Sequence, residues 1–326
     1  RATMRVEGRE AKIARDLIAH YDVHARRLPW RAPPGANASD AYRVWLSEVM
    51  LQQTTVAAVG PYFAKFTERW PTVESLADAA DADLMAAWAG LGYYARARNL
   101  LACARAVARD HDGMFPDTEA ALRALPGVGA YTAAAVAAIA FGRRAVVVDA
   151  NVERVVARLF AITTPLPAAR TEIRAAADTI TPDARAGDFA QAMMDLGATI
   201  CTARNPACGI CPIRDHCDAV LTADPAAFPV KAAKKARPHR TGHAWWIQRG
   251  DGHVWLVRRP DKGLLGGMRA LPSSDWGVDP DATPPFAAQW RTLEPAVAHV
   301  FTHFSLALSV HATHVGQDHA PPGAGE

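Results

Sequence analysis

Hydrophobic and polar positions along residues 9–220 follow the period of an α-helix. In "REAKIARDLIAHY" the apolar residues Ile13, Leu17 and Tyr21 stand four apart, which places them on one helix face. "DADLMAAWAG" and "YARARNLLACARAVARDHDG" read as further helices that end at a glycine, with Asp81 as the candidate N-cap of the first. The pattern predicts an all-α domain over residues 1–221.

The pattern changes after residue 221. The stretch 222–240 holds three prolines and ends in "KAAKKARPHR", which has five Lys or Arg and no acid, so we expect an exposed basic linker. Beyond it, "HAWWIQ" and "HVWLVRR" flank the turn "RGDG", and "FSLALSV" alternates apolar and polar residues over 304–310, which is the period of a strand. We expect a smaller domain with β-strands over residues 241–316 and a disordered tail over 317–326.

Composition and charge narrow the functional classes. Half of the residues are hydrophobic and 21% are charged, as in a soluble globular protein, and no run of about 18 apolar residues predicts a membrane span. The first residues lack the apolar core of a signal peptide, so we expect a protein of the reducing cytoplasm, where disulfides are rare. A net charge of +3 permits nucleic-acid binding without requiring it, and the basic run at 231–240 is alternatively a solvated linker.

The cysteines are concentrated in one short segment, "CTARNPACGICPIRDHC", which contains Cys201, Cys208, Cys211 and Cys217. Four thiolates on a compact loop can close a tetrahedral shell around zinc or ligate a cubane iron–sulfur cluster. Zinc sites usually present two short cysteine pairs, whereas the spacing C-x6-C-x2-C-x5-C has one such pair with wider gaps on both sides. This asymmetry favours a [4Fe–4S] cluster over zinc, disulfides or free thiols. Its role is expected to be structural, because no redox-partner motif accompanies it.

The segment "ALRALPGVGAYTAAAVAAIAFG" reads as a helix, a Pro-Gly-Val-Gly turn and a second helix. Gly127 and Gly129 allow backbone angles that point successive amide N–H groups outward, and the second helix adds the positive end of its dipole. Such a turn can hold a phosphate group, although a plain helix–helix turn shows the same pattern. The cysteine loop about seventy residues later makes the phosphate-binding interpretation more specific.

These motifs resemble the helix-hairpin-helix DNA glycosylases of the endonuclease III class, through "LPGVGAYTA", "VDANV" and the cysteine spacing. Within that class the chain is most similar to the MutY-type adenine DNA glycosylases, through "LPWR", "VWLSEVMLQQTTV", "GLGYYARARNL", "FPVKAAKKARP", "GLLGGM" and "HVFTH". The resemblance implies a multi-domain α + α/β protein, with a helical catalytic domain and iron–sulfur loop, the basic linker and a Nudix-like domain that reads 8-oxoguanine. It further implies a monomer acting on double-stranded DNA with adenine opposite 8-oxoguanine or guanine, in a bacterial-type cytoplasm and associated with the nucleoid.

The resemblance also assigns the chemistry to particular residues. Glu48 lies within the apolar helix "VWLSEVML", where desolvation would raise its pKa and keep it protonated near neutrality, so that it can protonate adenine and later activate water. Asp149 matches the carboxylate that faces the developing oxocarbenium ion or links to it covalently, and its alternative is a pure helix cap. Asn151 orients that site. Tyr131 stands where bifunctional glycosylase/lyases have the lysine that forms a Schiff base, which predicts base removal without strand cleavage.

Further residues match positions that read the lesion. Gln53 would enter the duplex beside the flipped adenine, with Gln52 next to it, and Tyr93 would be the second wedge. Plain polar surface and ordinary packing are the alternatives for these residues. The remaining matches are Arg31 and Gln191 at the adenine pocket, Thr54 and Leu91 beside the opposite base, Gly127 and Gly129 at the DNA backbone, and Phe301, Thr302 and His303 in the Nudix-like domain.

Two positions depart from the family pattern, and one family element is missing. Thr302 replaces the usual serine of Phe-Ser-His, and Arg269 stands where tryptophan is common. No acidic helix of the type R-E-x-x-E-E follows Gly267, so we expect this domain to bind a base rather than to hydrolyse pyrophosphate with a metal.

Two other functions remain open from the sequence. One is a related glycosylase for another mismatch or an oxidised base. The other is a noncatalytic DNA-binding protein, against which the presence of both Glu48 and Asp149 argues.

Overall fold

A computed structural model of the chain describes residues 8–36, 39–222, 224–232, 236–260 and 263–319. These residues form two compact units that divide between residues 232 and 233. We call them the helical unit and the strand unit and describe each by itself. The boundary lies within the segment 222–240 that we expect to be a linker. Most of the predicted tail, residues 320–326, lies outside the described residues.

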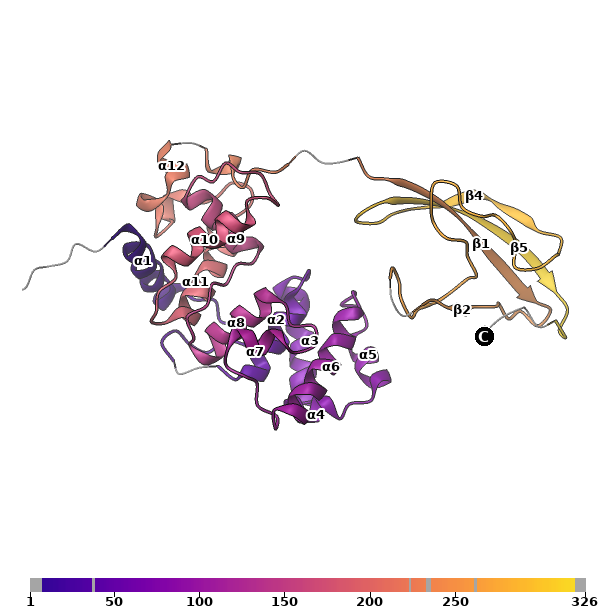
Figure 1. The fold of residues 1–326 in the computed structure, drawn as a ribbon, viewed down its shortest axis with the longest axis horizontal. Coiled ribbons are helices and arrows are strands. Elements are labelled where there is room, and N and C mark those ends of the chain that lie inside the picture. Colours follow the sequence, from indigo (N-terminus) through magenta and orange to yellow (C-terminus); the bar gives the residue numbers. More distant parts are fainter. Residues whose placement is uncertain (1–7, 37–38, 223, 233–235, 261–262, 320–326) are drawn as a thin grey trace, which may run out of the picture. The chain divides into compact units, whose positions relative to one another are not determined.

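The helical unit contains α-helices joined by short loops (Figure 1). Their bounds are α1 Arg9–His24, α2 Ala41–Leu51, α3 Val56–Arg69, α4 Val73–Ala77, α5 Asp81–Trp88, α6 Ala95–Asp110, α7 Glu119–Arg123, α8 Ala130–Phe141, α9 Ala150–Leu159, α10 Arg170–Ile180, α11 Ala186–Thr199 and α12 Asp218–Thr222, with short 3₁₀ turns at Cys208–Ile210, Arg214–His216 and Pro225–Ala227. Asp81 is the first residue of α5, and Ala80 occupies the N-cap position, where it makes no side-chain hydrogen bond. The predicted capping role of Asp81 is therefore wrong, although an acid in the first turn still suits the helix dipole.

Helix α8 lies at the centre of the helical unit and packs against α2, α7 and α11. Residues 132–140 are all buried, and most of them are alanine. Because these side chains are small, neighbouring backbones approach closely: a Cβ added to Gly187 of α11 would lie 2.5 Å from the carbonyl oxygen of Ala138. The glycine thus lets α11 settle directly onto α8.

The first helix packs with helices from the other end of the helical unit. Helix α1 contacts α10 and α11, and Arg9 at its start donates hydrogen bonds to the carbonyl oxygens of Leu159 and His216 and pairs with Asp218 at 2.8 Å. Helices α2 to α7 pack mainly on one another and on α8. The helical unit therefore has two lobes, one of contiguous sequence and one that joins the first helix to the last ones.

The first part of the segment predicted as an exposed linker is packed onto the helical unit. Phe228 is buried, and its carbonyl oxygen accepts a hydrogen bond from Arg158 at 3.1 Å. The backbone N–H of Leu166 donates to Val230, and that of Ala232 donates to Leu166. The prediction of an exposed linker is therefore wrong for Phe228, whereas Ala226, Ala227, Lys231 and Ala232 are exposed.

The strand unit contains two small sheets (Figure 1). Their strands are β1 His239–Arg249, β2 Val257–Arg258, β3 Arg269–Ala270, β4 Arg291–Val300 and β5 Ser305–Val315. The larger sheet has the order β1-β5-β4, with β1 parallel to β5 and β4 antiparallel to it, and the smaller pairs β2 with β3. Described residues 236–260 and 263–319 include no helix.

The predicted hairpin around "RGDG" is only partly formed. Arg249 and His253 pair across the turn, and Gln248 pairs with Val254, but the second run continues only as the two-residue strand β2. On the edge of β1 that faces this second run, Ala244 pairs with Ser273 and Thr241 pairs with Gly277, so residues from farther along the chain take the place of the second run, while the other edge of β1 pairs with β5. The alternating segment at 304–310 lies at the start of β5 as predicted.

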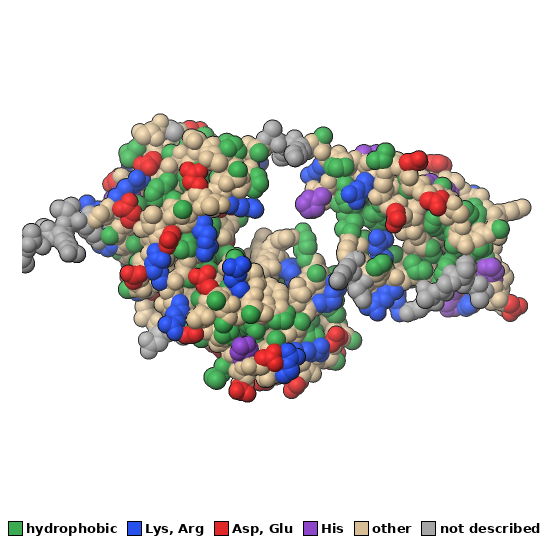
Figure 2. Space-filling view, viewed as in Figure 1, with side chains coloured by type: hydrophobic (Ala, Val, Ile, Leu, Met, Phe, Trp, Pro, Cys, Tyr) green, Lys and Arg blue, Asp and Glu red, His purple; other side chains and the backbone are tan. Residues whose placement is uncertain are grey.

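The surface and the helices agree with the composition. On the face drawn in Figure 2, basic and acidic side chains are interspersed over the helical unit, as the small net charge of +3 suggests. Among the described helices, none combines the length and the apolar character that a membrane crossing requires.

Candidate active site

A cavity of about 750 Å³ opens in the helical unit between α2, the start of α8, the start of α9, α11 and the segment after α1. It brings together residues that lie far apart in the sequence. The predicted residues that line it are Arg31, Glu48, Gln52, Gln53, Thr54, Tyr131, Asp149, Asn151 and Gln191. The two candidate catalytic carboxyl groups therefore face one shared space.

Glu48 is the buried carboxyl group of this cavity. It lies in α2, one turn before the helix ends, and is 6% exposed. Tyr131, the second residue of α8, donates its hydroxyl hydrogen bond to Oε2 of Glu48 at 2.6 Å. Burial raises the pKa of Glu48 to about 7, while the Tyr131 hydrogen bond and the charge of Arg31 lower it and Asp149 raises it. Glu48 can thus hold a proton near neutral pH and release it there.

Tyr131 is itself half-buried, with its hydroxyl beside Glu48. Burial and the neighbouring carboxyl groups of Glu48 and Asp149 raise the pKa of its phenol well above the ordinary value. Its hydroxyl therefore keeps its proton and acts as a hydrogen-bond donor to the carboxylate form of Glu48.

Asp149 lies in a different environment, at the N-cap of α9. Its Oδ1 accepts a hydrogen bond from the N–H of Val152 at 2.7 Å, and its Oδ2 accepts one from Nδ2 of Asn151 at 3.2 Å. Asn151 is held in turn by Arg154, which donates to its Oδ1 at 2.9 Å and to the carbonyl oxygens of Gly197 and Cys201. The capping role and a role toward the cavity coexist, because the half-buried carboxylate also lines the cavity.

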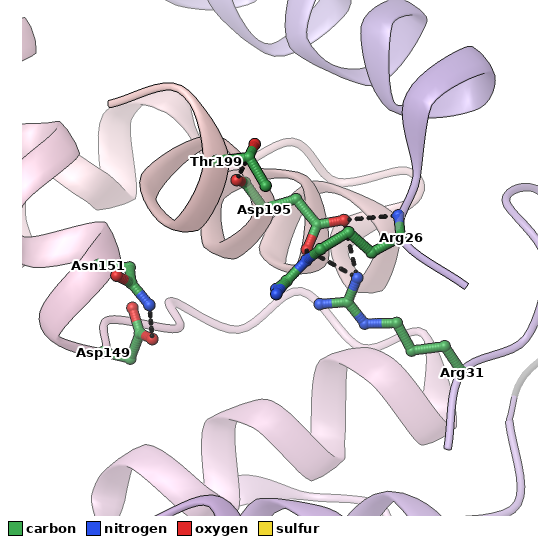
Figure 3. Close-up of polar contacts among 6 residues, drawn as sticks. All are labelled: Arg26, Arg31, Asp149, Asn151, Asp195 and Thr199. Atoms are coloured by element: carbon green, nitrogen blue, oxygen red, sulfur yellow. Dashed lines mark hydrogen bonds and ion pairs between the residues drawn. The ribbon is translucent and has the colours of Figure 1, made fainter. Parts of the chain in front are cut away.

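Asp195 organises the opposite wall of the cavity (Figure 3). Nη1 of Arg31 donates to both carboxylate oxygens of Asp195, each at 2.8 Å. The Nε–H of Arg26 donates to Oδ1 at 2.6 Å, and the backbone N–H of Arg26 donates to Oδ2 at 3.0 Å. Asp195 thus fixes the guanidinium of Arg31 beside Glu48. The sequence analysis missed both Asp195 and Arg26. The available signal was helical spacing, since Asp195 follows Gln191 by four residues on α11 and falls on the same face.

Other predicted residues of the helical unit lie outside this cavity. Leu91 is buried, whereas Tyr93 is 58% exposed. Gly127 has a φ of 71° in the turn between α7 and α8, where an added Cβ would lie 2.6 Å from that of Asn99. Gly129 is the N-cap of α8 and makes no side-chain hydrogen bond to the first turn. Within the described residues the N–H groups of that turn are therefore free of a side-chain cap, as a phosphate site requires.

The predicted residues of the strand unit form the turn of a hairpin. Val300 of β4 pairs with Ser305 of β5, and the N–H of Phe301 donates to the carbonyl oxygen of Phe304 at 2.8 Å. Thr302 and His303 form the exposed tip. The rings of Phe301 and Phe304 stack with centroids 4.7 Å apart, and this contact stabilises the turn.

The four cysteines of residues 201–217 line a second cavity together with the buried guanidinium of Arg158. Arg158 is 2% exposed and donates to the Sγ of Cys201 at 3.3 Å and to the carbonyl oxygen of Thr202 at 2.7 Å. No described carboxylate pairs with it, so the thiolates are its natural counter-charge. The four thiols around one cavity are the ligand type and number that an iron–sulfur cluster needs.

Three separate parts of the chain match known families. Residues 46–179 match the HhH-GPD superfamily of base excision DNA repair proteins, residues 201–217 match the iron-sulfur binding domain of endonuclease III, and residues 243–325 match the NUDIX domain. The loop therefore carries a [4Fe–4S] cluster, which confirms the predicted cofactor. The predicted fold class, with a helix-hairpin-helix domain and a Nudix-like domain, is confirmed as well.

Individual relatives of the chain are adenine DNA glycosylases. The chain is 35% identical to an adenine DNA glycosylase of Mus musculus over 95% of this chain and 72% of that protein. It is 45% identical to one of Mycolicibacterium smegmatis (strain ATCC 700084 / mc(2)155) over 62% of this chain and 67% of that protein. It is 37% identical to one of Arabidopsis thaliana over 82% of this chain, and spans only 48% of that relative.

Solved structures share the fold of a large part of the chain. A thermostable thymine-DNA glycosylase matches with a TM-score of 0.59 and 29% identity, over 65% of this chain and 97% of the other. A non-covalent endonuclease III–DNA complex matches with a TM-score of 0.54 and 23% identity, over 66% of this chain and 98% of the other, and shows the shared fold alone. On this combined sequence and structural similarity, the chain belongs to the adenine DNA glycosylases, a family of DNA-binding base-excision-repair enzymes.

Proposed function

We propose that this protein hydrolyses the N-glycosidic bond of adenine paired with 8-oxoguanine or guanine, and that it has no intrinsic lyase activity. The observation that carries the proposal is the hydrogen bond from Tyr131 to the buried Glu48 in the cavity that Asp149 also lines. One carboxyl group has a pKa of about 7 and the other caps a helix. Two carboxyl groups in such different environments are the arrangement by which glycosidic bonds are broken.

In the proposed reaction, adenine leaves the base stack and enters the cavity. Protonated Glu48 donates its proton to a ring nitrogen of adenine, and the bond to the sugar breaks with both electrons leaving on the base. Asp149, held by Asn151, stabilises the positive charge that develops on the sugar. Water then adds to the sugar carbon, its proton returns to Glu48, and an abasic site remains.

The absence of lyase activity follows from the side chain at position 131. Strand cleavage by a glycosylase needs an amine that forms a Schiff base with the opened sugar. Tyr131 offers a phenol there, and its hydroxyl is already bonded to Glu48 at 2.6 Å.

Contacts with DNA are proposed at three places. The turn at Gly127 and the uncapped start of α8 would hold a phosphate, and the exposed side chains of Gln53 and Tyr93 would fill the space that adenine leaves. The exposed tip at Thr302 and His303 would read the base opposite adenine. We also propose that the protein acts as a monomer, because the proposed catalytic residues Glu48, Tyr131 and Asp149 of a single chain already meet in one cavity.

The test uses the full chain and a duplex with one adenine opposite 8-oxoguanine. We expect strand scission after alkali and none before it, and no release of adenine by Glu48→Gln. A second duplex with thymine opposite guanine should remain intact; cleavage of that duplex in place of the first would establish the alternative specificity. Borohydride should trap little wild-type protein on the DNA and clearly more of Tyr131→Lys. Efficient trapping of the wild type would overturn the monofunctional proposal.

A further inference from the structure

Two turns beside the cavity hold non-glycine residues in the left-handed backbone region. Gln53, in the turn that follows α2, has a φ of 57°, and Tyr93, in the turn before α6, has a φ of 49°. Each such conformation raises the energy of the backbone by about 1–2 kcal/mol and persists only where surrounding contacts enforce it. Both side chains are largely exposed, so burial of these side chains in the core does not hold either turn.

Arg96 of α6 contacts both turns with one guanidinium group. Its Nη1 donates to the carbonyl oxygens of Val49 and Met50 at 3.1 and 3.0 Å, which are among the orphan acceptors at the end of α2. Its Nη2 approaches the carbonyl oxygens of Leu91 and Gly92 at 3.3 and 3.5 Å and Oγ1 of Thr54 at 3.4 Å. One planar group therefore joins the end of the helix that carries Glu48 to the turn that carries Tyr93.

The charge of Arg96 is balanced by dipoles and rings. No described carboxylate lies within ion-pairing distance of it, and its Nε is buried without a hydrogen-bond partner. Its guanidinium carbon lies 5.4 Å from the ring centroid of Trp88 and 5.6 Å from that of Tyr93, distances at which the ring quadrupoles stabilise a cation. The negative end of the α2 dipole also stabilises the positive charge of Arg96. The contacts with Thr54 depend on the first turn, and those with Leu91, Gly92 and Tyr93 depend on the second.

We propose that Arg96 is a positioning residue that locks the turn at 52–54 to the turn at 91–93, so that Gln53 and Tyr93 enter DNA as one preformed wedge. This proposal rests on the proposed function, in which adenine is extruded. Extrusion must overcome stacking of a few kcal/mol, and a wedge that is already ordered contributes its full contact energy to that step. The lock itself touches neither the base nor the sugar.

The test compares Arg96→Met and Arg96→Lys with a matched control on the same helix. Arg105→Met is that control, because Arg105 also donates to backbone carbonyls, those of Ala77 and Ala79 at 3.2 and 3.0 Å, and does not line the active-site cavity. Single-turnover adenine release is measured on two duplexes. In one, adenine is stacked opposite 8-oxoguanine; in the other, abasic analogues flank the adenine, so that little unstacking is needed.

We expect Arg96→Met to slow release from the stacked duplex at least about tenfold, because hydrogen bonds to a charged group are lost. Release from the pre-unstacked duplex and the pH dependence set by Glu48 should remain close to the wild type. Arg96→Lys should be intermediate and Arg105→Met unaffected on both duplexes. Thermal unfolding and iron content verify that each variant is folded.

The outcomes separate the two proposals. Equal losses on both duplexes, or no loss on either, would overturn the role of Arg96. A wild-type protein that releases no adenine from either duplex would overturn the proposed function. In that case the role of Arg96 is tested by base extrusion alone, with 2-aminopurine in place of the adenine. Its fluorescence should rise when Arg105→Met binds the duplex and stay low when Arg96→Met binds it. A rise with both variants would refute the lock.

Discussion

Replacing Tyr131 by phenylalanine tests how the active site keeps the pKa of Glu48 near neutral pH. The hydroxyl of Tyr131 donates to Glu48 at 2.6 Å and stabilises the ionised carboxylate, which lowers the pKa of Glu48 against the larger upward effect of burial. Without the hydroxyl, the ionised form loses that donor. The pKa of Glu48 therefore rises in Tyr131→Phe.

The size of the shift follows from the energy of the hydrogen bond. A hydrogen bond to a charged group contributes about 1.5–3 kcal/mol, and 1.36 kcal/mol corresponds to about one pKa unit. Starting from a pKa of about 7, the variant should titrate about one to two units higher. Below pH 6 both proteins hold a protonated Glu48, so each works at its own plateau. Near pH 8 the variant should retain about 50–90% of its plateau rate, whereas the wild type should retain only about 10% of its own.

The assay is single-turnover adenine release between pH 5.5 and 9.5, with each profile normalised to its own plateau. Tyr42→Phe is the matched control, because it removes a buried tyrosine hydroxyl that donates to the carbonyl oxygen of Trp70 at 2.7 Å outside the cavity, and its profile should coincide with the wild type. If the decrease of the adenine-release rate at high pH occurs at the same pH in Tyr131→Phe as in the wild type, or at a lower pH, Glu48 is not the acid whose pKa Tyr131 lowers.

Three further predictions concern stability. The folded-state pKa of Glu48, about 7, lies above its ordinary value of 4.5. The stability that protonated Glu48 contributes is therefore fully present below pH 4.5 and is lost as the pH rises through 7. In urea unfolding, the wild type should lose about 3 kcal/mol of unfolding free energy between pH 4.5 and 8 relative to Glu48→Gln. Gly187→Ala should destabilise by about 2–3 kcal/mol, because its methyl group would lie 2.5 Å from a backbone oxygen, whereas Gly60→Ala, whose new atom meets nothing within 4 Å, should leave the unfolding midpoint unchanged or raise it. Arg158→Met should lower the iron and sulfide content of the purified protein, because the thiolates lose their buried cation; full cluster occupancy would contradict that role.

The sequence pattern predicted the helices and the local motifs well, because each depends on neighbours in the chain. The period of apolar residues in α1 and α6, the glycine turn before α8 and the cysteine spacing are all local signals. The apolar context of Glu48 also indicated its burial. Residue 131 was singled out by the resemblance, but its hydrogen bond to Glu48 joins positions 83 apart in the sequence, and no local pattern contains it.

Two elements were missed for identifiable physical reasons. Strand β4 is exposed along almost all of its length, so neither side of it needs apolar residues and no alternation marks it; Pro295 also argues against a strand, and it falls where the pairing with β5 is irregular. Asp195 is an acid in a buried helix that needs two arginines from a distant loop. Only the folded chain shows that its charge is compensated.

The packing of α1 against α10 and α11 has a consequence for how the enzyme is made. Helices α2 to α7 can fold as they leave the ribosome, because their partners are close in sequence, but α1 must wait for its partners to be synthesised. The cavity takes Glu48 from the early lobe and Gln191 from the late one. A nascent or prematurely terminated chain that lacks α11 therefore carries Glu48 without the part of the cavity wall that α11 supplies.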